Sequence, residues 1–198
     1  MPSILGAVLN VDDVLDAYVT ENVNDSPITI RGATLTAHSL YVAAVGGVAQ
    51  NIGEAIWSKK SPGCAYNGNT TVVVVDDSSG YSFPYPQYNV TFEIPDALPI
   101  LFAVNLINNA NVPTNAAALI QNAIVSAFSG GDGGVRARIG STIFASRYYA
   151  PVAALGAWAQ IVSITIGSAN TPQVTFTASI SGLVTDTGGM QDVVSDGD

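Results

Sequence analysis

The amino-acid sequence predicts an α+β fold with two small β-α-β-containing domains, each with a mixed sheet, and a β-rich C-terminal tail. Short segments in which apolar and polar residues alternate occur along the whole chain, and this pattern is typical of strands. Between them, two stretches carry apolar residues at helical spacing. At 198 residues, of which 48% are hydrophobic, the chain is long enough to bury a core in one ordinary domain or two small ones.

The first half of the chain is predicted to contain four strands and one helix. The expected strands are Val14 to Thr20, Ser39 to Val45, Thr70 to Val75 and Tyr88 to Ile94. Gly46 and Gly47 form a structural turn that ends the second strand, and a helix follows from Val48 to about Lys60. No helix or partner strand is expected before Val14, which suggests that the chain is a fragment of a longer protein.

The second half is predicted to contain two strands and two helices before the tail. A strand from Pro99 to Ile107 precedes a helix that Pro113 opens and a glycine-rich run, Gly130 to Gly134, closes. A further helix is expected from Ser141 to Leu155, where Pro151 kinks or splits it because proline removes a backbone donor. Ala157 to Ile166 then alternates with a period of two and is predicted to be a strand.

Four domain ranges follow from these elements. Residues 1–27 hold the end of a preceding domain, residues 28–95 a first α+β domain, and residues 96–167 a second one. Residues 168–198 are expected to form a β-rich, flexible tail with one or two weak strands and a frayed acidic end, 192–198.

The chain is poor in charge, since only 11% of its residues are charged, so much of its surface must be uncharged. Such a surface suits a subunit that is covered inside a larger complex, or alternatively a stable secreted protein. Fifteen acidic and six basic residues give a net charge of -9, and the basic ones form no dense run, which argues against nucleic-acid binding. No apolar stretch approaches a membrane span. Cys64 is the single cysteine, which leaves the redox compartment open.

The residues that carry chemistry do not form a recognisable catalytic or metal motif. His38, the single histidine, lies where a strand begins and is expected to be a hydrogen-bonded or solvated strand-end residue, the alternative being a hydrolase centre. The acidic residues of 12–16 lack the glycine and distal glutamate of a calcium loop. Gly130 to Gly134 lacks the Lys-Ser/Thr ending of a phosphate-binding loop and is interpreted as a flexible connector. We therefore expect no enzyme activity, metal or cofactor.

Aromatic residues gather in the run from Tyr81 to Tyr88 (YSFPYPQY). Exposed tyrosines and prolines make rigid contact surfaces, so Tyr81 and Tyr85 are candidates for a ligand or carbohydrate platform. The alternative, which we favour, is a long hairpin loop packed on its own sheet. Three further aromatic residues are expected in the core or at a subunit interface: Tyr148, Tyr149 and Trp158.

Five segments occur in an order that is familiar from a known family. They are Asp16 to Asn22 (DAYVTEN), Ala37 to Gly47 (AHSLYVAAVGG), Ile52 to Gly63 (IGEAIWSKKSPG), Asn67 to Thr70 (NGNT) and the strand ending in Val90-Thr91-Phe92. Together they resemble the C-terminal portion of the baseplate J-like family, the wedge proteins of contractile phage tails and related injection machines. The most specific part is the order of valine, paired glycines, helix, lysine, glycine and asparagine-glycine-asparagine.

The resemblance implies a structural role without chemistry. Members of this family link the tail tube, the sheath and the fibre-bearing periphery in a ring, and they hold a metastable arrangement that is released on contact with the host. For this chain, the resemblance implies contacts with other baseplate subunits, a homo-oligomeric state and a location in the virion tail baseplate after synthesis in the bacterial cytoplasm. The alternative function is a binding module, an adhesin or carbohydrate-binding domain that uses the loop from Tyr81 to Tyr88.

Overall fold

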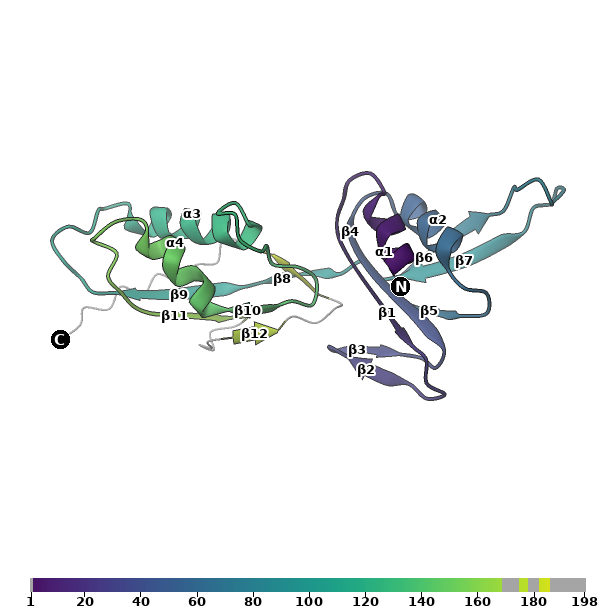
Figure 1. Cartoon of the computed structure of the whole chain (residues 1–198), viewed down its shortest axis with the longest axis horizontal. Helices are drawn as coiled ribbons and strands as arrows, with labels where there is room; N and C mark the ends of the chain where they lie inside the picture. The colour runs from purple at the N-terminus through teal and green to yellow at the C-terminus, as the bar shows by residue number, and fades with distance from the viewer. Residues whose placement is uncertain (1, 169–174, 178–181, 186–198) are drawn as a thin grey trace. The chain divides into compact units, whose positions relative to one another are not determined.

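The computed structural model describes residues 2–168, 175–177 and 182–185, and these residues form an α+β fold (Figure 1). Contacts between residues divide the described part of the chain into two compact units. Unit 1 holds residues 2–96 and 182–183, and unit 2 holds residues 97–168, 175–177 and 184–185. No helix among the described residues is both long enough and apolar enough to cross a membrane.

Unit 1 is built on a mixed three-stranded sheet. Its elements are α1 (Pro2–Leu9), β1 (Val14–Asn22), β2 (Ile28–Ile30), β3 (Ala33–Leu35), β4 (Ser39–Gly46), α2 (Ala49–Lys59), β5 (Ala65–Asn67), β6 (Thr70–Val75) and β7 (Gln87–Phe92). The sheet order is β1-β4-β5, in which β1 runs antiparallel and β5 parallel to β4. Because two parallel strands need a crossover between them, α2 closes a β-α-β unit. Two hairpins, β2-β3 and β6-β7, complete the unit.

The predicted strands and helix of unit 1 are confirmed within a few residues at each end, and β6 has the predicted bounds. The expectation that no helix precedes the first strand is wrong, since α1 lies there and buries Ile4 and Val8. Residues 1–27 were assigned to the end of a preceding domain, whereas β1 pairs with β4 from Asp16 to Asn22. The described residues of that range therefore belong to the same unit as β4.

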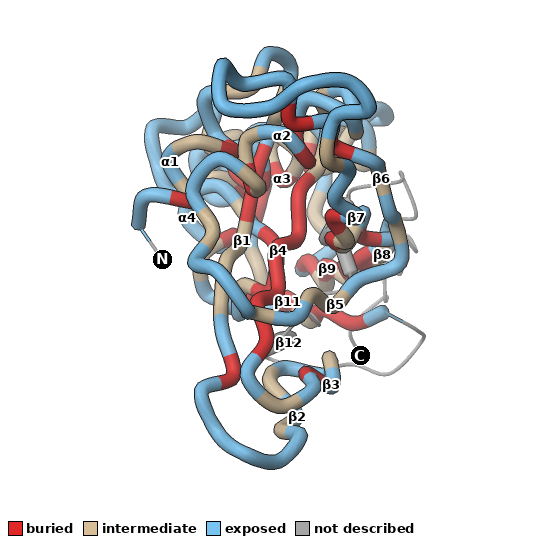
Figure 2. The backbone as a smooth tube through the Cα atoms, turned by 90° about the vertical axis from the view of Figure 1, so that its right-hand side faces the viewer, coloured by how far each residue is buried: buried red, intermediate tan, exposed pale blue. Residues whose placement is uncertain are grey.

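The core of unit 1 lies between the sheet and the two helices. Alternate residues of β4 (Leu40, Val42 and Ala44) are at most 2% exposed and belong to one cluster with the apolar faces of α1 and α2. Figure 2 shows β4 as a strand that is buried along most of its length. A strand with buried residues on both faces is typical of the centre of a sheet, which explains the continuous apolar run of SLYVAAV.

The turn between β4 and α2 requires glycine at two successive positions. Gly46 and Gly47 have φ values of 77° and 71°, in the left-handed region that side chains with a Cβ rarely adopt. A methyl group on Gly46 would collide with the carbonyl oxygen of Asp13, and one on Gly47 would lie 2.6 Å from a methyl carbon of Val14. The two glycines thus allow the turn to pack directly on the start of β1.

Unit 2 places helices on a small antiparallel sheet. Its elements are β8 (Asp96–Pro99, whose first residue belongs to unit 1), β9 (Leu101–Leu106), α3 (Ala116–Ser129), β10 (Thr142–Phe144), the 3₁₀ turn η1 (Ala145–Tyr148), α4 (Tyr149–Ala153), β11 (Ile161–Gly167), β12 (Thr175–Thr177) and β13 (Gly182–Thr185, whose first two residues belong to unit 1). The strands pair as β9-β11, β10-β12 and β8-β13. The first two pairs are antiparallel, so α3 does not join two paired parallel strands.

Three sequence predictions of unit 2 are confirmed, those of β9, α3 and β11. The tail contains two short strands, as expected. The helix predicted from Ser141 to Leu155 is wrong for its first half. Thr142-Ile143-Phe144, which is β-branched and aromatic, forms β10 and pairs with β12, and α4 begins only at Tyr149. Pro151 lies in the first turn of α4, where its missing N–H costs nothing. The acidic end, 192–198, lies outside the described residues.

The core of unit 2 is an aromatic and aliphatic cluster between β9, β11 and the helices. Phe102 is 4% exposed and contacts two rings edge-on, Phe128 at 6.4 Å and Tyr148 at 4.7 Å between ring centres. Ile120 and Ile124 of α3 complete the contact with the sheet. Burial of such a phenylalanine contributes a few kcal/mol and fixes the helix on the sheet.

Candidate functional site

The candidate site is the aromatic hairpin, which comprises β6, β7 and the connecting loop of residues 76–86. The register pairs Thr70 with Phe92 and Val75 with Gln87, and Asp76 N–H extends the ladder by donating to Pro86 O at 2.9 Å. Within unit 1, the hairpin projects beyond the end of α2 (Figure 1). Its base is part of the core and its tip is not.

The two faces of the hairpin differ in burial. Val74, Val90 and Phe92 are at most 2% exposed and pack toward α2, where Gly53 allows Val72 to approach the helix closely. Val73 and Val75 lie on the opposite face and are about half exposed. The alternation of TTVVVV therefore gives one face to the core and leaves apolar side chains on the other.

The tip carries aromatic rings that solvent reaches. Phe83 is 85% exposed, Tyr81 is 48% exposed and Tyr85 is 39% exposed. Phe83 and Tyr85 contact each other edge-on, with 6.2 Å between ring centres. Because the tip is exposed, the interpretation of this run as a loop packed on its own sheet is wrong for these three residues.

Local hydrogen bonds brace the start of the loop that carries the tip. The Asp76 carboxylate accepts hydrogen bonds from the backbone N–H of Ser78 at 3.2 Å and from its hydroxyl at 2.6 Å, which is the geometry of an Asx turn. Tyr81 N–H donates to Ser78 O at 3.0 Å. Tyr88 contacts Trp57 of α2 at 5.6 Å between ring centres. Loss of contact with water raises the pKa of Tyr88, and the nearby Tyr81 and Asp76 raise it further.

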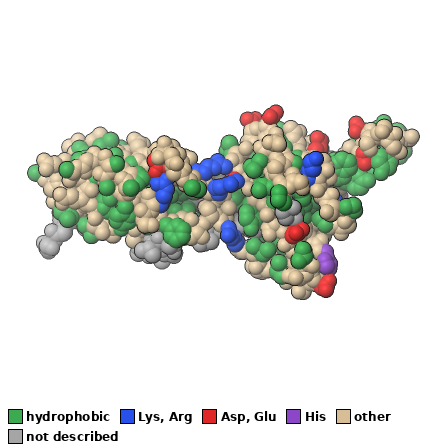
Figure 3. All heavy atoms as spheres, in the orientation of Figure 1, with side chains coloured by type: hydrophobic (Ala, Val, Ile, Leu, Met, Phe, Trp, Pro, Cys, Tyr) green, Lys and Arg blue, Asp and Glu red, His purple; other side chains and the backbone are tan. Residues whose placement is uncertain are grey.

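Acidic side chains are the charged groups of the aromatic hairpin. Residues 70–92 contain Asp76 and Asp77 but neither lysine nor arginine. Asp77 is exposed, whereas Asp76 is 8% exposed and engaged by Ser78. In Figure 3 the visible face of the projection is hydrophobic or uncharged with acidic atoms beside it. The tip thus combines accessible rings with negative charge.

The other aromatic residues named from the sequence are not brought to this surface. Tyr148 is 3% exposed in the core of unit 2, where burial raises the pKa of its hydroxyl to about 12. Trp158 is partly buried against the same core. Tyr149 is at the surface, but its hydroxyl accepts a hydrogen bond from Ile164 N–H at 3.0 Å. These three residues therefore belong to the structure of unit 2.

His38 borders a pocket of about 390 Å³ in unit 1. Its Nε2 lies 2.8 Å from Asp25 Oδ1, and both side chains are largely exposed. Ser39 is next in the chain, but its hydroxyl donates to Thr36 O at 2.6 Å rather than facing the imidazole. Cys64 also lines the pocket, with its thiol 3.6 Å from Ala65 O. The arrangement agrees with a hydrogen-bonded strand-end histidine.

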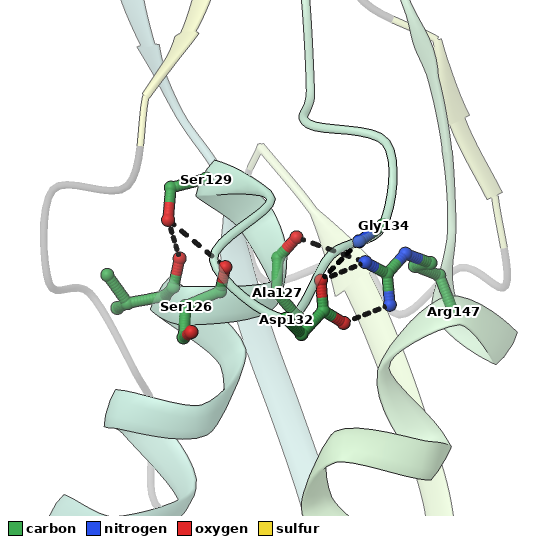
Figure 4. Close-up of polar contacts among 7 residues, drawn as sticks. Ser126, Ala127, Ser129, Asp132, Gly134 and Arg147 are labelled. Carbon is green, nitrogen blue, oxygen red and sulfur yellow. Dashed lines mark hydrogen bonds and ion pairs between the residues drawn. The ribbon is translucent and has the colours of Figure 1, made fainter.

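The glycine-rich run of unit 2 is held by an ion pair (Figure 4). Arg147 donates from both terminal nitrogens to the Asp132 carboxylate, each at 2.6 Å, and Gly134 N–H donates to the same carboxylate at 3.0 Å. These contacts lower the pKa of Asp132 to about 2. The donors that a phosphate would take are thus used by the protein's own carboxylate. Within the described residues, no cluster of three or more His, Cys, Asp or Glu side chains is suited to a metal.

The asparagines of the Asn-Gly-Asn motif have a structural role that the motif alone did not reveal. Asn67 accepts from Thr36 N–H at 3.0 Å and donates to Ser39 Oγ at 2.7 Å, which joins β5 to the segment before β4. Asn69 donates to Ile94 O and accepts from Ile94 N–H, both at 2.9 Å. Asn67 therefore secures β5 beside β4, and Asn69 closes the base of the aromatic hairpin.

Sequence reasoning missed Phe83, Val73 and Val75 as surface residues of the hairpin. The available signal for the valines was the continuous run of TTVVVV, which places apolar side chains on both faces of a strand, and the signal for Phe83 was its central position in the aromatic run. The fold and this surface define an α+β protein with an exposed aromatic projection. No model of a known protein family matches the chain, and no curated protein sequence matches it.

Proposed function

We propose that the chain is a structural subunit of a baseplate wedge in a contractile phage tail or a related injection machine. In this role it links tube, sheath and periphery through protein contacts, as a homo-oligomer and with other baseplate subunits, and catalyses no reaction. The order of segments that resembles the baseplate J-like family motivates the proposal.

The exposed aromatic hairpin is the observation that supports it most. Aromatic residues dominate the energetics of protein interfaces because they bury large areas with few rotatable bonds. Here Phe83, Tyr81 and Tyr85 are exposed at the end of a paired hairpin. Charged residues are few in the whole chain, which suits a subunit with extensive covered surface.

Disruption of the gene in the source bacterium tests the proposal. We expect particles released by the unaltered strain to contain this chain, by mass spectrometry, and electron micrographs of the disrupted strain to lack complete tails. A plasmid copy of the gene should restore them, and a plasmid carrying a premature stop codon is the control. Complete, contractile tails in the disrupted strain would exclude this function.

The alternative function is a carbohydrate-binding module or adhesin, and the same exposed rings favour it, since sugar faces stack on tyrosine and phenylalanine. A glycan screen of the full chain against its Tyr81→Ala, Tyr85→Ala double variant separates the two functions. The baseplate role predicts no glycan signal that depends on these residues. A signal that the double variant loses would favour the binding module.

A further inference from the structure

We propose that the tip of the aromatic hairpin binds a cationic segment of a different protein subunit, one that presents Lys or Arg side chains to Phe83, Tyr81 and Asp77. The partner is taken to be a subunit of the same particle, so this inference rests on the proposed function. It adds the chemistry that the partner must have.

The composition of the tip selects a cation. The face of an aromatic ring carries partial negative charge and attracts ammonium and guanidinium groups, and a carboxylate on the same loop can add an ion pair with a cationic segment. Phe83 and Tyr81 supply accessible rings and Asp77 an exposed carboxylate. Since residues 70–92 contain no cation, nothing on the hairpin itself neutralises this charge.

Two cationic side chains of this protein already lie over tyrosine rings. The Lys60 ammonium lies 4.6 Å from the centre of the Tyr66 ring, and the Arg31 guanidinium lies 6.0 Å from that of Tyr18. Both distances fall within the range at which the attraction is significant. A partner that places Lys or Arg over Tyr81 or Phe83 would repeat a contact that this fold contains twice.

The strands of the hairpin and the start of its loop are already bonded before a partner binds, which lowers the entropic cost of the contact. Ser78 bonds to Asp76, Tyr81 N–H bonds to Ser78 O, and Trp57 packs on Tyr88. A pre-formed surface loses less freedom on association than a flexible loop would lose. Side-chain recognition by this tip therefore needs no folding step in the hairpin.

Charge complementarity favours a different subunit over a second copy of this chain. The chain carries fifteen acidic and six basic residues, for a net charge of -9. The acidic tip therefore gains little from a second copy of the chain, in which one of the six cations, Arg147, is engaged by Asp132. A basic partner gains from the same field that a second copy would oppose.

Photo-crosslinking from position 83 tests the inference on the full chain. The natural chain is replaced in the source bacterium by one with p-benzoylphenylalanine in place of Phe83, which is exposed enough for this change to leave the fold intact. Purified particles and the cleared lysate are irradiated separately, and the crosslinked peptides are sequenced. We expect a peptide from another protein with Lys or Arg beside the crosslinked residue.

Three outcomes would overturn the inference: a crosslink to a second copy of the chain, a crosslink to a peptide without cations, and no crosslink at all. The two samples separate this result from the proposed function. A crosslink to a basic segment in the lysate, with no chain in the tail particles, would support recognition of a cationic partner by the tip and would remove the baseplate role. A crosslink in the tail particles to a peptide without Lys or Arg would support the baseplate role and overturn the inference of a cationic partner.

Charge reversal supplies an independent measurement. Asp77→Lys in the photoreactive chain should lower the crosslink yield roughly tenfold, because like charges would then face each other. Asp12→Lys, an exposed aspartate in the turn between α1 and β1, makes the same change in net charge and should leave the yield unaltered. Equal yields for the two variants would show that the carboxylate does not contribute and would overturn the charge-based part of the inference.

Discussion

The two compact units hold their irregular segments by different means. In unit 1, the amide side chains of Asn22, Asn67 and Asn69 bond to backbone groups of distant segments. In unit 2, one long-range amide bond, from Asn109 to Trp158 O at 3.1 Å, accompanies an aromatic core and a clamp between Asp132 and Arg147, which hold the segments around α3 and α4. Directional bonds fix one loop geometry each, whereas packing fixes whole elements. The two units should therefore respond differently to substitution.

The largest expected loss of stability is that of Phe102→Ala. This variant tests whether packing of the aromatic core holds unit 2 together. Removal of a buried phenylalanine leaves a cavity and costs about 3–5 kcal/mol in the free energy of unfolding. The two tryptophans, Trp57 in unit 1 and Trp158 in unit 2, serve as separate fluorescent reporters once each is studied in the Trp→Phe variant of the other.

We expect urea unfolding followed through Trp158 to shift to lower urea, while the signal of Trp57 changes less. Phe144→Ala removes the same ring from an exposed position of unit 2 and is the matched control. An equal shift of both signals would mean that the two units unfold together, and the comparison would then fail.

The second-largest expected loss of stability is that of Asn22→Ala in unit 1. Asn22 is 1% exposed; its amide donates to the carbonyls of Ser26, Leu35 and Thr36, and its oxygen accepts from Asn24 N–H. Alanine leaves these buried groups unpaired, at a cost of about 1–3 kcal/mol. Urea unfolding followed through Trp57 measures the loss.

Asn51→Ala, an exposed position of α2, is the control and should change the midpoint little. If Asn22→Ala is as mild as its control, then packing rather than amide bonding holds the loop around β2 and β3.

A smaller effect is expected from Asp132→Asn, and it depends on pH. Arg147 lowers the pKa of Asp132 from an ordinary 3.8 to about 2, so the folded protein favours the ionised carboxylate. The stabilisation is complete above the ordinary pKa and is lost as the pH falls through the folded value. Thermal unfolding of unit 2 should thus differ between variant and natural chain near pH 7.

The difference between the two melting temperatures should shrink as the pH falls from about 4 to about 2, the window between the two pKa values. Asp77→Asn makes the same chemical change on an exposed loop of unit 1 and is the matched control. A difference that stays constant over this range would mean that the ion pair does not account for it.

The smallest expected effect on stability is that of Phe83→Ser. A ring that is 85% exposed contributes little to folding, so the free energy of unfolding should stay within about 0.5 kcal/mol. Tail assembly should nevertheless fail in the complementation assay if the tip is an interface. Phe144→Ser is the matched control in assembly. A large loss of stability in Phe83→Ser would place the ring in the core instead.

Most elements were predictable from the sequence because their patterns are local. The β-branched run TTVVVV predicted β6, and the paired glycines predicted the boundary between β4 and α2. The helix α1 was missed because its eight residues carry only two buried positions, too few for a clear period. The strand β10 was predicted as helix because its pairing with β12, more than thirty residues away, is invisible to a local pattern.

The candidate site was predictable only in part. Tyr81 and Tyr85 were found from the aromatic run, but their exposure depends on how far the hairpin extends beyond α2, which periodicity does not give. Tyr148 lay next to Tyr149 in the same predicted helix, and a one-residue difference in register decided that one is buried and the other exposed. Burial of single aromatic residues is a tertiary property.

The bonds of Asn67 also affect the chemical durability of the protein. An asparagine followed by glycine is the sequence most prone to deamidation, and asparagine is among the thermolabile residues. Asn67 precedes Gly68, and its amide nitrogen donates to Leu40 O at 3.2 Å. Conversion to aspartate would place a carboxylate oxygen against that carbonyl oxygen and separate β5 from β4. The resistance of unit 1 to deamidation during storage therefore depends on how well the Asn67 amide stays hydrogen-bonded.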